Sequence, residues 1–121
     1  MILVDTSVWI DHLRHADEEL TKALEDGEVV THPFVIGELA CGNLRNRAVV
    51  MTLLEDLPRA REATHEEVMA MVEGRRLMGA GIGYVDAHLL AATALTPATR
   101  LWTRDKRLDG AAQRMGLTGE S

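Results

Sequence analysis

Four acidic residues stand beside the predicted strands and helices of this chain, and their type suits the binding of a divalent cation. They are Asp5, Glu38, Asp86 and Asp105. Carboxylate oxygens are the ligands that Mg²⁺ and Mn²⁺ prefer in proteins. Carboxylates held within a few ångströms of one another repel, unless a cation lies among them. If the fold brings the four together, a metal site is therefore the expected result.

Each acid taken singly also has a structural explanation, because an Asp at the start of a helix usually caps it. Glu38 resists that explanation. Its neighbours Ile36 and Leu39 are apolar, so the helix that carries it is expected to lie inside the structure. A carboxylate on such a helix favours a functional role.

The elements that must position these acids are predicted from apolar periodicity, in which strands alternate with helices. The predicted strands are residues 2–4, 28–31 and 100–103, with shorter ones at 59–63 and after 116. The predicted helices begin near residues 6, 18, 33, 47, 65, 84 and 105. This alternation predicts an α/β fold, a three-layer α/β/α sandwich around a central parallel sheet of four to five strands. The carboxyl ends of parallel strands share one edge of the sheet, so the four acids are expected to converge there.

Length and composition indicate one globular domain over residues 1–121, with 46% hydrophobic and 26% charged residues. Aromatic residues make up only 3%, which argues against surfaces that stack nucleic-acid bases on aromatic rings. The single cysteine allows no disulfide within the chain. No apolar run is long enough for a membrane helix, and the N-terminus lacks the pattern of a secretory signal. We therefore expect a cytoplasmic protein without a membrane partner.

The net charge of −6 argues against a nucleic-acid partner, since phosphate binding depends on basic residues. Four of those charges belong to the four acids, however, and setting them aside leaves −2. Basic residues also flank Glu38 and Asp105, where they are expected to contact phosphates. They are Arg45, Arg47, Arg104, Lys106 and Arg107.

Four short motifs follow one another in an order and at spacings that are specific in combination. They are MILVDTSVW at 1–9, HPFVIGELA at 32–40, GIGYVDAHLLAA at 81–92 and LWTRD at 101–105. With them the chain resembles, over essentially its whole length, the PIN-domain ribonucleases, and among these the VapC-type toxins of toxin–antitoxin pairs. The resemblance implies a five-stranded parallel sheet, Mg²⁺-dependent cleavage of RNA, a homodimer and a cognate antitoxin. It matches the four acids one by one to the acidic positions of the family, and Thr6 or Ser7 and Thr103 to hydroxyl positions beside them.

On this hypothesis two acids hold Mg²⁺, or Mn²⁺ as a substitute, and orient a water that attacks the phosphodiester in line. Asp5 and Asp86 are the first choice as direct ligands, because short side chains at strand and helix ends are rigidly placed. Glu38 and Asp105 bind directly or through water. Arg104 or Lys106 is expected to stabilise the developing negative charge.

Two other classes of protein compete with the nuclease. In a phosphorylation-controlled receiver domain, residues 49–54 would form a buried strand that ends near an acceptor Asp56. That class needs a second acid directly after Asp5, where the chain has Thr6, and it leaves Glu38 without a role. A catalytically inactive PIN-like binding module would lack one of the four acids, and none is missing.

Three histidines and a set of apolar residues on two predicted helices allow further predictions. His12, His32 and His88 are predicted to be surface or capping residues, and His88 is the one closest in sequence to Asp86. The apolar residues of the third and fourth predicted helical regions exceed the needs of a small core, which favours a groove for an antitoxin segment. They are Val35, Leu39, Leu44, Val49, Val50, Leu53 and Leu54.

Overall fold

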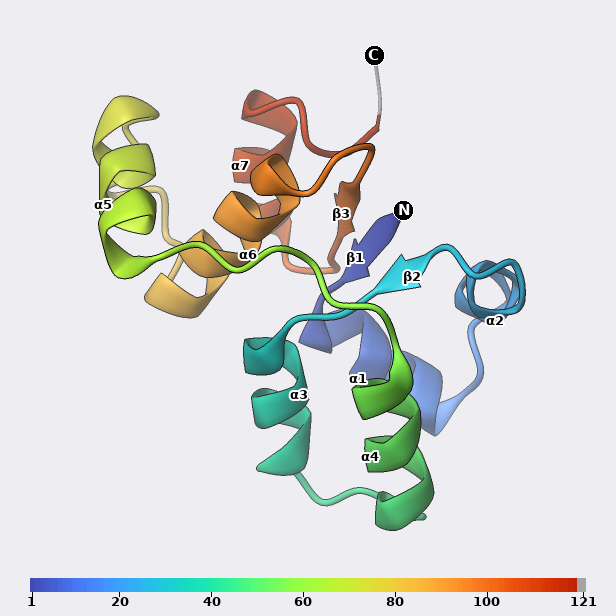
Figure 1. The fold of residues 1–121 in the computed structure, drawn as a ribbon. Coiled ribbons are helices and arrows are strands. Elements are labelled where there is room, and N and C mark those ends of the chain that lie inside the picture. The colour runs from blue at the N-terminus through green and yellow to red at the C-terminus, as the bar shows by residue number, and fades with distance from the viewer. Residues whose placement is uncertain (120–121) are drawn as a thin grey trace.

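The computed structural model describes residues 1–119, and the last two residues lie outside the description. Within this described range, seven helices and three strands form over the predicted segments, but the two types do not alternate throughout, because four helices in succession separate the second strand from the third (Figure 1). The elements are β1 Ile2–Val4, α1 Thr6–Arg14, α2 Glu18–Glu25, β2 Val29–Val30, α3 Pro33–Ala40, α4 Arg47–Asp56, α5 His65–Gly74, α6 Tyr84–Leu95, β3 Arg100–Trp102 and α7 Lys106–Arg114.

The sheet is parallel, with strand order β2-β1-β3. Leu3 of β1 is in register with Val30 on one side and with Leu101 on the other. All three residues of β1 are buried, as a wholly apolar strand covered on both faces requires. The first strand is thus the centre of the sheet, and the strand order reverses beside it.

The sheet has three strands over residues 1–119, so the predicted count of four to five is not confirmed. The segment expected as an edge strand at 59–63 forms only one parallel bridge, between Thr31 and Arg59. Beyond α7, Leu117 accepts a single hydrogen bond, from the backbone N–H of Leu101, at 2.8 Å. Both segments lie along the sheet edges, but neither makes the repeated bonds that define a strand.

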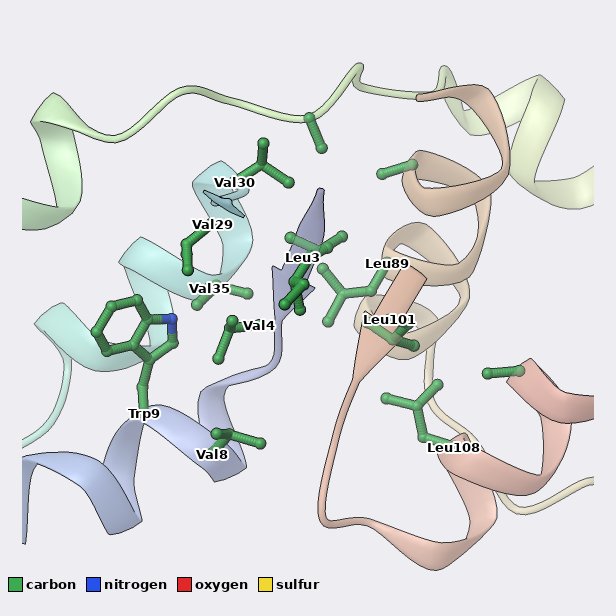
Figure 2. Close-up of a cluster of buried hydrophobic side chains, with 14 of the residues drawn as sticks. Leu3, Val4, Val8, Trp9, Val29, Val30, Val35, Leu89, Leu101 and Leu108 are labelled. Carbon is green, nitrogen blue, oxygen red and sulfur yellow. The ribbon is translucent and has the colours of Figure 1, made fainter. Parts of the chain in front are cut away.

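Helices gather on two sides of the sheet (Figure 1). One group contains α1, α3 and α4, in which α3 contacts both neighbours, and the other contains α5, α6 and α7, of which α6 and α7 contact β3. Figure 2 shows the core between them: Trp9 and Val35 lie on one side of β1, and Leu89 and Leu108 lie on the other. These four side chains are at most 1% exposed.

The receiver alternative is wrong, because the segment it requires as a strand is helical. Residues 47–56 form α4, whose only buried residue is Leu54. Asp56 is the last residue of this helix and is exposed, so it does not follow a strand of the sheet.

Thr64 begins α5 with the predicted capping box: its side chain accepts a hydrogen bond from the N–H of Glu67, whose carboxylate accepts one from the N–H of Thr64.

Among residues 1–119, none of the helices is long and apolar enough to cross a membrane.

Candidate functional site

The site lies at the carboxyl edge of the sheet, where β1 and β3 end side by side. The backbone N–H of Asp5 donates to the carbonyl of Trp102 at 2.9 Å, so the residues after the two strands begin as neighbours. The strand order reverses next to β1, and ligands of open parallel sheets bind at such a point. The first and third strands therefore deliver Asp5 and residues 103–105 to one place.

Asp5 is held by two hydroxyl groups, as the resemblance implied. The hydroxyls of Ser7 and Thr103 each donate to Oδ2 of Asp5 at 2.7 Å, and the two hydroxyl oxygens lie 3.3 Å apart. The backbone N–H of Asp105 donates to Thr103 Oγ1 at 3.0 Å. Asp5 is only 6% exposed, so this network fixes a nearly buried carboxylate and ties it to the loop that carries Asp105.

Glu38 is held from the other side of the edge by the third predicted hydroxyl. The hydroxyl of Thr6, the first residue of α1, donates to Oε1 of Glu38 at 2.7 Å. The helix that carries Glu38 is buried at Ile36 and Leu39, but Glu38 itself is exposed. The expectation that this helix lies inside the structure therefore holds for one of its faces, and Glu38 projects from the other.

Asp86 and Asp105 open helices, and both also act as caps. Oδ2 of Asp86 accepts from the N–H of Gly83 at 3.3 Å, and Oδ1 of Asp105 accepts from the N–H groups of Arg107 and Leu108 at 2.9 and 3.2 Å. In each of the four acids, one carboxylate oxygen accepts hydrogen bonds from the protein. The other oxygen accepts no hydrogen bond from any residue in 1–119. Capping and ligand binding are thus compatible, because they use different oxygens.

The four acids act on one another electrostatically. Burial raises the pKa of Asp86; the hydrogen bond from Gly83 opposes this shift, and the charges of Asp5, Asp105 and Glu38 add to it. Within residues 1–119, however, no three acidic, histidine or cysteine side chains are close enough together to bind one metal ion. The donor set fits a hard cation that keeps several of its waters, as Mg²⁺ does, rather than a closed protein cage.

The predicted phosphate contacts differ in their surroundings. Arg104 is already paired, because Nε lies 2.7 Å from Oδ2 of Asp11 and Nη2 lies 2.8 Å from Oδ2 of Asp17. Its guanidinium also lies 5.9 Å from the centre of the Trp102 ring. The pKa of Asp17 is lowered, first by the hydrogen bond from the N–H of Leu20 and then by Arg104, against the effect of burial. Arg104 therefore joins the loop after β3 to α1 and α2 instead of lying free.

Arg107 lies against the glycine turn that leads into α6, a contact that sequence reasoning missed. A Cβ atom on Gly81 would lie 2.6 Å from Cδ of Arg107 and 2.9 Å from its Nη1, so any larger residue here would push the Arg107 side chain away from the turn. Gly81 also has a φ of +80°. The alternating glycines at 79, 81 and 83 were the available signal, but they predict a turn and not what packs on it. Lys106 is exposed in the same turn of α7, while Arg45 and Arg47 lie in the loop between α3 and α4 and at the start of α4.

The histidines follow the expectation only in part. His32 caps α3, since its Nδ1 accepts from the N–H of Phe34 at 3.0 Å, and His12 accepts from the N–H of Asp17 at 3.0 Å. His32 is thus a capping residue as expected, although it is only 1% exposed, whereas His88 is 6% exposed and caps no helix, so the expectation is wrong for His88. The reason for His88 is that residues 87–93 of α6 are all buried. Burial is also the main cause that lowers the pKa of each ring.

Comparison with known proteins agrees with this architecture. Residues 2–113 match the model of the PIN domain family. Two proteins named Ribonuclease VapC32, from the CDC 1551 / Oshkosh and ATCC 25618 / H37Rv strains of Mycobacterium tuberculosis, are each 53% identical over 117 residues, covering 97% of this chain and 94% of the relative. The chain therefore belongs to the PIN-domain family, and its resemblance to the VapC-type ribonucleases of that family is confirmed.

Proposed function

We propose that this protein is a metal-dependent endoribonuclease that acts as the toxin of a toxin–antitoxin pair. The observation that supports the proposal is the set of hydroxyl contacts that hold Glu38, Asp5 and the loop of Asp105, with the charges of these three acids acting on Asp86. Each of the four acids keeps one carboxylate oxygen that accepts no hydrogen bond from residues 1–119. The names of the two relatives, Ribonuclease VapC32, support the reaction class.

Asp5 and Asp86 would hold Mg²⁺ or Mn²⁺ directly, and Glu38 and Asp105 would do so directly or through water. A bound ion of this kind lowers the pKa of a water and neutralises charge on a phosphodiester. The protein's own part is positioning: Ser7 and Thr103 fix Asp5, and Thr6 fixes Glu38. A bound cation would relieve the repulsion among the acids, and this repulsion therefore favours cation binding.

Chelation is the direct test of this function. The purified protein is expected to cleave total RNA in the presence of Mg²⁺ or Mn²⁺, and an excess of chelator should abolish cleavage because the acids alone cannot polarise the water. Electrophoresis of the RNA, followed by mapping of the new ends, measures both activity and sequence preference. Full activity in excess chelator would overturn the metal mechanism.

The antitoxin site we propose is a groove beside Glu38. A cavity of about 870 Å³ lies between α1, α3 and the start of α4. Its apolar lining includes Ile10, Leu13, Leu39, Leu44, Val49 and Val50. Val49 is 70% exposed, an unusual state for valine, whereas Val35 and Leu54 of the predicted apolar set are fully buried and belong to the core.

An apolar antitoxin segment that also carries an arginine suits this groove. Glu38 lines it next to the apolar residues, and a guanidinium pairs with carboxylates through two parallel hydrogen bonds. Such a partner would cover the apolar surface and compete with the metal for Glu38. We propose further, from length and cysteine content, that residues 1–121 form a single cytoplasmic nuclease domain, and, on the resemblance alone, that the chain acts as a homodimer.

Gly81 and Gly79 allow a matched test of the Arg107 contact. Gly81→Ala is expected to lower kcat/KM for RNA by roughly 10-fold, because the new Cβ displaces Arg107 from the turn before Asp86. Gly79→Ala is the control: its φ of +75° imposes the same backbone strain, but nothing lies within 4 Å of its Cβ. Both variants should lose about 1 kcal/mol of stability, measured by thermal unfolding. Equal activity in the two variants would show that the position of Arg107 against Gly81 does not affect RNA cleavage.

A further inference from the structure

Five ring side chains from three helices and one cap meet in what we call the ring cluster. Its members are His32, Phe34, His65, Tyr84 and His88. It contains the only Phe and the only Tyr of the chain and three of its five histidines. The low aromatic content argued against a surface for stacking bases, but the fold has gathered a large share of the rings in one place.

His88 lies at the centre of the ring cluster. The rings of Phe34 and Tyr84 both meet it nearly edge to face, with centroids 4.8 and 4.6 Å away and interplanar angles of 66° and 83°. The hydroxyl of Tyr84 lies 2.7 Å from Nδ1 of His65, and this contact restrains the Tyr84 ring. These contacts hold Phe34 and Tyr84 in place before any ligand arrives.

Two histidines of the ring cluster are buried, whereas its Phe and its Tyr are exposed. His32 is 1% exposed and His88 is 6% exposed, whereas Phe34 is 37% and Tyr84 is 48% exposed. Aromatic rings that are held by buried neighbours and are partly exposed can bind a ligand with little further loss of conformational entropy. Every base has a flat face, so these rings can stack a base of any identity.

The two open rings stand on the same helices as two of the acids. Phe34 precedes Glu38 by four residues, one turn earlier on the exposed side of α3. Tyr84 is the first residue of α6, and Asp86 follows in the same turn. Phe34 is thereby the open ring one helical turn from an acid, and Tyr84 is joined to Phe34 through the ring of His88, which contacts both.

Charge at this edge favours recognition of bases over recognition of phosphates. The four acids repel the RNA backbone, and Arg104, one of the nearby cations, is taken up by Asp11 and Asp17. An uncharged ring face adds affinity without depending on net charge, and it is insensitive to salt. Resting on the proposed ribonuclease function, we propose that Phe34 and Tyr84 bind a nucleobase next to the scissile phosphate.

Leucine substitutions at the two rings test this site. Phe34→Leu and Tyr84→Leu are each expected to raise KM for a single-stranded RNA about 10-fold with little change in kcat, since stacking is already present in the ground state. Tyr84→Phe should keep a KM near that of the wild type, because it loses only the hydroxyl contact to His65 and keeps both the ring and its contact with His88. Leu95→Ala is the matched control, as Leu95 is a 39% exposed apolar residue at the opposite end of α6.

Three outcomes separate the possibilities. Absence of metal-dependent cleavage by the wild-type protein would overturn the ribonuclease function, and this inference with it. Cleavage by both leucine variants with wild-type KM and at the same sites would overturn the base site alone. If sedimentation shows that Phe34→Leu or Tyr84→Leu changes the oligomeric state while RNA affinity per protomer is unchanged, the ring cluster joins two copies of the chain and the base site is again overturned.

Discussion

Asp5→Asn is expected to reduce the rate of RNA cleavage by about 10³-fold or more without unfolding the protein. The amide oxygen can still accept the hydrogen bonds from Ser7 and Thr103, so the local structure is retained. The negative charge and the metal-binding oxygen of a carboxylate are lost. Single-turnover cleavage of a labelled RNA measures the first effect, and thermal unfolding checks the second.

Asp86→Asn should lose activity to a similar extent but gain stability in the absence of metal. Because the pKa of Asp86 is raised by burial and by the other acids, the folded protein binds this proton more tightly than the unfolded chain. The ionised group therefore destabilises the fold once the pH exceeds its unfolded value near 3.8, and the penalty disappears at lower pH. Asn removes that penalty, so its advantage should appear at neutral pH and vanish in acid.

Asp56→Asn serves as the control, since Asp56 is exposed at the end of α4 and should affect neither measurement. A sharp fall in the melting temperature of metal-free Asp86→Asn would instead show that the cap to Gly83 is the main role of this acid. The hypothesis of a repelling metal site would then be wrong for Asp86.

Expression of the chain alone is expected to arrest bacterial growth, and co-expression of the protein encoded beside it should restore growth. Val49→Arg should escape this rescue, because a charged side chain in the apolar groove weakens antitoxin binding by roughly 30-fold or more. Val49 is 70% exposed, so the change leaves the core intact. Colony counts and the dissociation constant of the purified complex measure the two effects.

Ala48→Arg provides the matched control, as Ala48 is exposed on the same helix but does not line the groove. If both variants are rescued equally, the antitoxin binds elsewhere. Harmless expression of active enzyme without any partner would contradict the toxin assignment, while leaving the nuclease site in place.

Local sequence signals predicted the elements that position the acids. The apolar run Ile2–Val4 can bury itself only as a central strand, and the capping box at Thr64 is a contact between residues three apart. Such signals need no knowledge of the remaining chain. The positions of Asp5, Asp86 and Asp105 near strand and helix ends, and of Glu38 within the helix after the second strand, follow from them.

Contacts between distant segments could not be predicted in this way. Arg104 looked like a free cation because its partners, Asp11 and Asp17, lie more than 85 residues earlier in the chain. His88 looked like a surface residue because nothing in its neighbourhood reveals that residues 87–93 are covered on every side. Composition argued against a base-stacking surface because it counts rings without stating where the fold places them.

The bond from Thr103 to Asp5 spans 98 residues of a 121-residue chain. The first strand cannot complete its sheet until the last strand, at Arg100–Trp102, has left the ribosome. Long-range pairing of this kind forms late in folding. A nascent chain therefore carries Asp5, Glu38 and Asp86 without an assembled site until residues 100–103 have emerged, and the candidate nuclease site is completed only after that point.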